Sequence, residues 1–153
     1  MPCPRPASLA LLTLLLTAGC GTAHTGDPTT TEFAAALNVS LANMERRESG
    51  LYVQDIPAGT GAEARFGSIP SVTYSLWLAD GELVDTNVGA RPFEFQLGLG
   101  HVIQGWEEGL LGMRVGGKRR LVIPAALGYG DEGSGPIPGN AVLVFEVELN
   151  SLR

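Results

Sequence analysis

The side chains that usually carry covalent or metal chemistry are sparse in this sequence. The two histidines, His24 and His101, are far apart, and no group of Cys, His, Asp or Glu has the spacing of a metal site. No serine or cysteine stands in a recognisable nucleophile motif with a histidine. Residues 98–105, GLGHVIQG, lack the Lys-Ser/Thr pair of a phosphate-binding loop. We therefore expect no covalent catalysis, no metal and no cofactor.

Aromatic and aliphatic side chains beside glycine-rich loops are what the sequence offers instead. Residues 100–113, GHVIQGWEEGLLGM, contain Trp106, the adjacent Glu107 and Glu108, and four glycines. Both the apolar residues and the glycines recur at helical spacing. An interior glycine destabilises a helix by about 1 kcal/mol relative to alanine. Glycines repeated along one side of a helix therefore indicate that this side lies close to a sheet. An inward-facing tryptophan there can form the floor of a small apolar pocket, whereas we expect both glutamates to be solvated.

Strand patterns surround this helical segment. Three segments alternate apolar and polar residues, and two more are less regular candidates: residues 71–78, 91–98, 140–152, 50–56 and 117–124. Asp80-Gly81 offers a tight turn after the first of them. Half-apolar alternation is typical of an antiparallel sheet with one solvated face, whose other face needs a cover. The prediction is an α+β fold in which the single helix covers the sheet.

Size, composition and charge narrow the classes further. The 153 residues suggest one domain, and 44% hydrophobic residues are enough for a core. The 21 glycines and 10 prolines indicate many turns rather than a helical bundle. The net charge of −6 and the lack of a long basic run disfavour nucleic-acid binding.

The first 19 residues have the pattern of a signal peptide. Arg5 precedes an apolar stretch from Leu9 to Leu16, and small residues lead to Cys20. The stretch is too short to span a hydrocarbon core, which needs about 20 apolar residues. LTAGC resembles a bacterial lipobox, although Thr17 stands where leucine is preferred. We predict an exported protein at the periplasmic or extracytoplasmic face of the cell envelope, held to the membrane by a lipid on Cys20. Plain secretion and an uncleaved anchor are the alternatives.

The rest of the chain divides into three parts. Residues 20–31 are small and polar and predict a flexible tether. Residues 32–48 carry apolar side chains at helical spacing after a capping-box pattern at Thr29 and Glu32, which predicts a helical lead-in. We favour packing of this helix on its own domain over a docking or dimerisation role. Residues 49–153 form the main domain. Cleavage before Cys20 leaves one thiol, so no disulfide can form within the chain.

Three motifs, in order and spacing, strongly resemble the FKBP-type peptidyl-prolyl cis-trans isomerases: VIQGWEEGLLGMRVGGKRRLVIP, LGYGDEGSGPIP and NAVLVFEVEL. The resemblance covers about residues 50 to 150, and the lead-in looks like that of bacterial, often exported members. It implies a twisted antiparallel β-sheet curled around one short α-helix, with a short N-terminal helical extension. It also implies catalysis of rotation about X–Pro bonds. The implied partners are proline-containing peptides, unfolded or nascent exported proteins, and macrolide inhibitors.

The same resemblance implies a substrate pocket. Its residues would be Tyr74, Asp85, Phe93, Val102, Ile103, Trp106, Tyr129, Ile137 and Phe145. Trp106 would lie beneath the proline ring, and the other aromatic rings would form walls. The Val102–Ile103 backbone and the Tyr129 hydroxyl would hold the peptide. Asp85 would either polarise the site or hold Tyr74 by a hydrogen bond, and the sequence does not decide between these roles.

Some positions depart from the family pattern. Val84 stands where the family often has Phe, so one pocket wall would be smaller, and the segment that follows, TNVGA, is one residue shorter. Gly139 replaces a common proline, and the loop of residues 131–136 is short. These changes put catalytic rate and macrolide affinity in question more than fold. A non-catalytic prolyl-peptide-binding module and a holdase chaperone working through residues 32–47 are the competing hypotheses.

Overall fold

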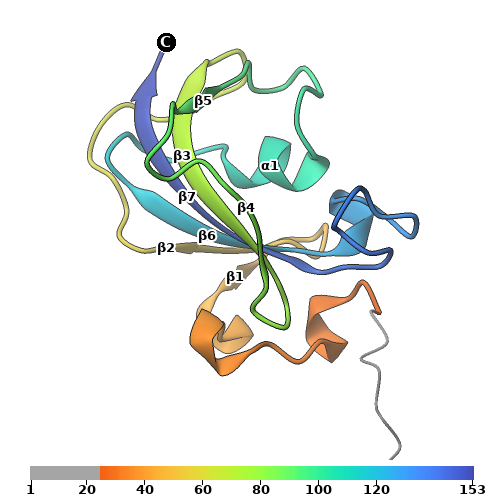
Figure 1. The fold of residues 1–153 in the computed structure, drawn as a ribbon. Coiled ribbons are helices and arrows are strands. Elements are labelled where there is room, and N and C mark those ends of the chain that lie inside the picture. The colour runs from red at the N-terminus through yellow and green to blue at the C-terminus, as the bar shows by residue number, and fades with distance from the viewer. Residues whose placement is uncertain (1–24) are drawn as a thin grey trace, which may run out of the picture.

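The computed structural model describes residues 25–153. The predicted signal peptide, residues 1–19, and Cys20 lie outside the described residues. In the described part, an antiparallel sheet of seven strands curls around a single short α-helix, α1 (Gln104–Gly109), which confirms the α+β prediction (Figure 1). No helix between residues 25 and 153 has the length and apolar character needed to cross a membrane.

The sheet has the strand order β1-β2-β6-β7-β3-β4, and β5 also pairs with β3. The strands are β1 (Glu45–Arg46), β2 (Tyr52–Asp55), β3 (Pro70–Leu78), β4 (Leu83–Thr86), β5 (Phe93–Glu94), β6 (Lys118–Ile123) and β7 (Leu143–Leu152). Each of the five predicted strand segments contains one of them. The segment 91–98 supplies only the two residues of β5, because the Leu97 amide donates to Ser68 in a loop rather than continuing the pairing with β3.

Helix α1 lies directly on strand β6. A Cβ atom at Gly105 would lie 2.6 Å from Ile123 Cγ2, and one at Gly109 would lie 2.8 Å from Leu121 Cδ2. The two glycines therefore permit the close approach that their spacing predicted. The helix is shorter than the periodic segment 102–113, since it begins at Gln104 and ends at Gly109, and Gly112 then turns the chain with φ +79°.

Two apolar clusters lie on opposite faces of the sheet. The larger one fills the space between α1 and the sheet and includes Trp106, Leu110, Leu121 and Phe145. The smaller one includes Val122 and Val144. These two are the strand neighbours of Leu121 in β6 and Phe145 in β7, so their side chains face the other way. Both faces are therefore covered here, which explains why the end of β6, residues 121–123, and the start of β7 are apolar without alternation. The predicted solvated face is confined to the parts of the sheet beyond this cover.

The cover of the second face is the N-terminal segment, which differs from the predicted helix. Residues 32–48 form no α-helix; the segment contains η2 (Ala35–Leu37), η3 (Leu41–Asn43) and then β1, with η2 and η3 each one turn of 3₁₀ helix. Asn38 adopts φ +51° and ends η2, which interrupts the apolar periodicity in the middle. Leu37 and Met44 are buried against Val122 and Val144. The segment thus packs on its own domain, as we favoured.

Residues 25–31 also pack on the domain, although the sequence predicted a flexible tether there. They contain the 3₁₀ turn η1 (Pro28–Thr30), in which Pro28 is buried. The Ala125 amide donates to the Gly26 carbonyl at 3.0 Å. The predicted capping box is wrong, because Asp27 caps this turn by accepting from the Thr29 amide at 2.8 Å.

Candidate active site

A cavity of about 460 Å³ opens between α1 and the inner face of the sheet. Its lining comes from β3, β4, β5, α1, β7 and two loops, and consists of Tyr74, Leu76, Asp85, Phe93, His101, Val102, Ile103, Trp106, Tyr129 and Phe145. Apolar and aromatic side chains dominate this set, with one carboxylate and two phenol hydroxyls. Such a lining is typical of a small-ligand pocket.

Trp106 is the centre of the aromatic lining. It is only 4% exposed, and the rings of Tyr74 and Phe145 approach it at centroid distances of 5.2 and 5.3 Å. The interplanar angles of 84° and 75° are edge-to-face, an arrangement that adds about 0.5–1.5 kcal/mol per pair beyond area burial. Phe93 lies further out, at 6.3 Å from Trp106. The tryptophan position is therefore fixed by rings from two adjacent strands.

The register of three adjacent strands brings the other lining residues together. Leu76 of β3 lies opposite Phe145 of β7 on one side and opposite Asp85 of β4 on the other. Tyr74 is two residues before Leu76, so its side chain points to the same face. Strand alternation and register therefore place an acid and two aromatic rings beside one another in the cavity.

Tyr74 and Asp85 form a direct hydrogen bond. The Tyr74 hydroxyl donates to Asp85 Oδ2 at 2.7 Å. Among residues 25–153 no Lys or Arg, Arg91 included, forms an ion pair with Asp85. Burial, followed by the Asp85 hydrogen bond, raises the pKa of Tyr74 from 10.0 to about 12. Burial and then the Asp85 charge also raise the pKa of Tyr129. The geometry thus shows the second of the two roles considered for Asp85, which is to hold Tyr74.

This hydrogen bond predicts a measurable titration. In an ultraviolet titration of tyrosinate, we expect Tyr74 to ionise near pH 12, and Asp85→Ala to lower that pKa because it removes both the acceptor and the charge. A raised pKa favours the protonated folded form. The stability that the raised pKa of Tyr74 contributes is fully present below pH 10 and is lost as the pH rises through about 12. The variant Tyr74→Phe lacks this phenol, so the part of the titration curve that disappears in it belongs to Tyr74. An unchanged titration curve in Asp85→Ala would contradict the assignment.

The cavity also presents polar groups that are available to a ligand. Within residues 25–153, neither the Ile103 amide nor the Tyr129 hydroxyl forms a hydrogen bond with another protein group. Tyr129 is 38% exposed at the rim, whereas Ile103 immediately precedes α1. One backbone donor and one hydroxyl therefore flank the aromatic floor.

All but one of the residues that the resemblance implied are brought together here. Ile137 is the exception, since it is buried in the main apolar cluster and does not line the cavity. Val84 packs against that cluster but is not part of the lining. Leu76 and His101 were missed. Leu76 could have been found from its two-residue spacing to Tyr74, whereas His101 carries no sequence signal beyond preceding Val102.

The two adjacent glutamates were expected to be solvated, and both instead hold neighbouring segments. The Glu107 carboxylate accepts from the Gly98 and Gly100 amides in the loop that leads to α1. Glu108 accepts from the Ser49 hydroxyl at 2.8 Å. They act through hydrogen bonds to segments near the helix and not on the cavity, so neither is an acid–base group of the site.

Both the sequence and the fold of this chain are similar to those of known proteins. The family described as "FKBP-type peptidyl-prolyl cis-trans isomerase" matches residues 61–150. An "FK506-binding protein" of Neisseria meningitidis serogroup B is 47% identical over 102 residues, which are 65% of this chain and 94% of that protein. "FK506-binding protein 4" of Rhizopus delemar is 46% identical over 106 residues, which are 69% of this chain but only 28% of that protein. The chain thus spans little more than a quarter of that fungal relative.

Solved structures are similar over most of the described part. The crystal structure of AtFKBP13 superposes with a TM-score of 0.68 at 34% identity, covering 72% of this chain and 98% of that one. FkpA from Escherichia coli gives a TM-score of 0.67 at 38% identity, covering 72% of this chain and 52% of that one.

Proposed function

This chain belongs to the FKBP-type peptidyl-prolyl cis-trans isomerase family, and from that membership we propose that it accelerates rotation about X–Pro bonds. The observation that carries the proposal is the cavity in which Trp106 is flanked by Tyr74, Phe93 and Phe145. A proline ring is a compact apolar group that such an aromatic floor accommodates. The substrates we propose are proline-containing peptides and unfolded or nascent exported proteins.

The chemistry needs no nucleophile. Resonance in the amide sets a rotation barrier of about 18–20 kcal/mol, and uncatalysed X–Pro exchange takes tens to hundreds of seconds. Twisting the bond breaks the resonance and reduces the charge separation across the amide. An apolar cavity disfavours the planar, more polar amide relative to the twisted one, and so lowers the barrier. The Ile103 amide and the Tyr129 hydroxyl would bind carbonyls of the flanking residues. Asp85 keeps the Tyr74 ring in position by its hydrogen bond.

An isomerisation assay tests the proposal. The protein from Gly21 to Arg153 is mixed with a prolyl peptide, with and without FK506, the compound in the names of several relatives. We expect faster cis-to-trans exchange that FK506 abolishes, because the drug would occupy the same cavity. A folded protein that binds the peptide without accelerating exchange would overturn the proposal in favour of the non-catalytic module. The holdase hypothesis has little structural support, because the apolar side chains Leu37 and Met44 of its proposed segment are already buried.

We also propose that the chain is exported and attached to the membrane by a lipid on Cys20. The support is the sequence pattern of residues 1–20. Because residues 25–31 pack on the domain, only residues 21–24 would separate the lipid from it, a reach of about 3.3–3.6 Å per residue. Labelling with a fatty acid in cells tests this. Incorporation should be lost in Cys20→Ala, and equal labelling of the variant would contradict the anchor.

A further inference from the structure

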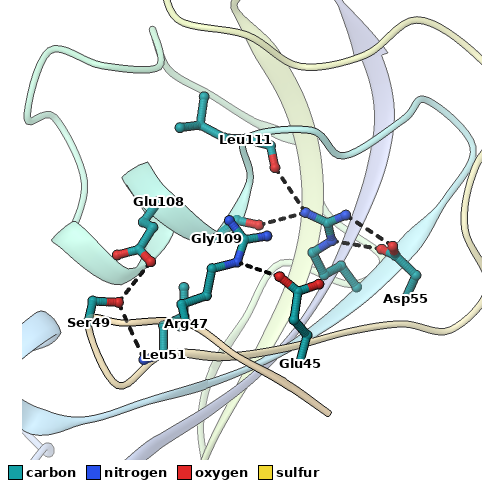
Figure 2. Close-up of polar contacts among 9 residues, drawn as sticks. Glu45, Arg47, Ser49, Leu51, Asp55, Glu108, Gly109 and Leu111 are labelled. Carbon is teal, nitrogen blue, oxygen red and sulfur yellow. Dashed lines mark hydrogen bonds and ion pairs between the residues drawn. The ribbon is translucent and has the colours of Figure 1, made fainter.

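Arg119 is a buried cation outside the cavity. It lies in β6, is 6% exposed and does not line the pocket. Its Nε and Nη2 donate to the two oxygens of Asp55 at 2.7 and 3.0 Å, and its Nη1 donates to the carbonyls of Gly109 and Leu111 at 2.9 and 3.1 Å. In Figure 2 dashed lines join the labelled Gly109, Leu111 and Asp55 to one unlabelled guanidinium, which these hydrogen bonds identify as that of Arg119. The guanidinium thus joins the end of α1 to the sheet.

The sheet register fixes the geometry of this group. Arg119 and Asp55 are direct cross-strand partners in the β2–β6 pair, which lets the carboxylate receive both nitrogens of the fork. Along β6, Arg119 shares its face with Leu121 and Ile123. Those two residues contact Gly109 and Gly105 of α1. The inward residues of β6 therefore meet successive points of the helix, and the first of them along the strand, Arg119, is charged.

Helix α1 needs such an anchor. It has only six residues, and a helix that short is not stable by itself. Its last turn contains no basic residue, and its final carbonyls have no partner within the helix. Its contact surface on β6 is made by glycines, which offer no side chain that interlocks with the strand. The glycine contacts with β6 are therefore not directional, and Arg119 supplies a directional contact at the end of the helix.

Burying a charge is costly unless it is paired, and an apolar residue at position 119 would avoid that cost. Retaining a charged group here is understandable if it sets the position of an element. We propose that Arg119, held by Asp55, is a positioning residue that fixes the register of α1 on β6 and thereby the place of Trp106 in the cavity. This inference goes beyond the isomerase proposal, and its activity readout rests on that proposal.

The test compares Arg119→Lys with a matched control in the full domain. Lysine keeps the charge but has no planar fork to bind Asp55 and both carbonyls together. The control is Arg114→Lys, because Arg114 also bonds a carbonyl, of Gly61, and a carboxylate, of Glu63, without contacting α1. The first readout is amide hydrogen exchange of residues 106–111 relative to that of β7. The second is kcat/KM for a prolyl peptide.

We expect Arg119→Lys to accelerate exchange in residues 106–111 by about tenfold with β7 little changed, and to lower kcat/KM by a similar factor, because charged hydrogen bonds at the helix end are lost. Arg114→Lys should leave both readouts within about twofold, as expected for an exposed pair. Asp55→Asn should shift exchange in the same direction as Arg119→Lys. Equal acceleration in α1 and β7 would show a general structural role and overturn the inference, as would unchanged exchange in α1. A wild-type protein without isomerase activity would refute the proposed function, while the exchange readout would still decide the role of Arg119.

Discussion

Replacing Trp106 with alanine is expected to lower kcat/KM for prolyl isomerisation by about tenfold or more, which corresponds to at least about 1.4 kcal/mol of transition-state stabilisation. The reason is that Trp106 packs against three of the aromatic rings that line the cavity, those of Tyr74, Phe93 and Phe145. Its removal would enlarge the cavity and admit water, which stabilises the planar amide relative to the twisted one. Trp106→Phe keeps an aromatic floor and should lose less activity.

Stability has to be separated from activity in this experiment. Truncating a buried Trp costs about 3–5 kcal/mol, so the assay must be run cold and with circular dichroism on the same sample. The chain offers a matched control in Trp77, which packs against the second cluster and contributes to a groove with Leu37 on the other face of the sheet. Trp77→Phe should retain wild-type kcat/KM. Full activity in a folded Trp106→Ala would show that this cavity is not the site of catalysis.

Much of the fold could be predicted because its signals are local. Two-residue alternation in residues 71–78 and 143–149 identified the two longest strands, and the glycines at positions 105 and 109 indicated a helix in close contact with a sheet. The lining of the cavity followed from the family resemblance and not from alternation alone. Alternation states which residues share a face, but it does not state which strands are neighbours. The register that sets Leu76 between Phe145 and Asp85 is a tertiary property.

The features that sequence reasoning missed depend on contacts with other segments of the chain. Glu107 looked solvated because its acceptor role needs two amides of the preceding loop. No role was assigned to Arg119 from the sequence, since its partner Asp55 lies 64 residues earlier in the chain. The N-terminal segment had helical spacing, but the left-handed Asn38 and packing on the sheet favoured separate turns. In each case a tertiary contact outweighed a local pattern.

The second large effect is expected at the glycines of α1. Gly→Ala inside a helix usually stabilises by about 0.5–1 kcal/mol. Here Gly105→Ala should instead lower the free energy of unfolding by about 1–3 kcal/mol, because the new methyl would overlap Ile123. Ile123 is β-branched and stiff, and its Cγ1, Cγ2 and Cδ1 atoms all lie within 3.0 Å of the added Cβ. Denaturant unfolding with a constant m-value measures the loss.

Gly109→Ala supplies the graded comparison. Its added Cβ would come closest to the two terminal carbons of Leu121, at 2.8 and 2.9 Å. Because leucine is not branched at Cβ, this side chain can rotate away. The loss in Gly109→Ala should therefore be smaller than in Gly105→Ala. If the overlap with Ile123 is the cause, Gly105→Ala combined with Ile123→Ala should be less destabilised than the sum of the two single variants, because the second change removes the atoms that the first one meets. Additive losses, or a stabilised Gly105→Ala, would mean that helix α1 does not lie against β6 at the distance that the geometry requires.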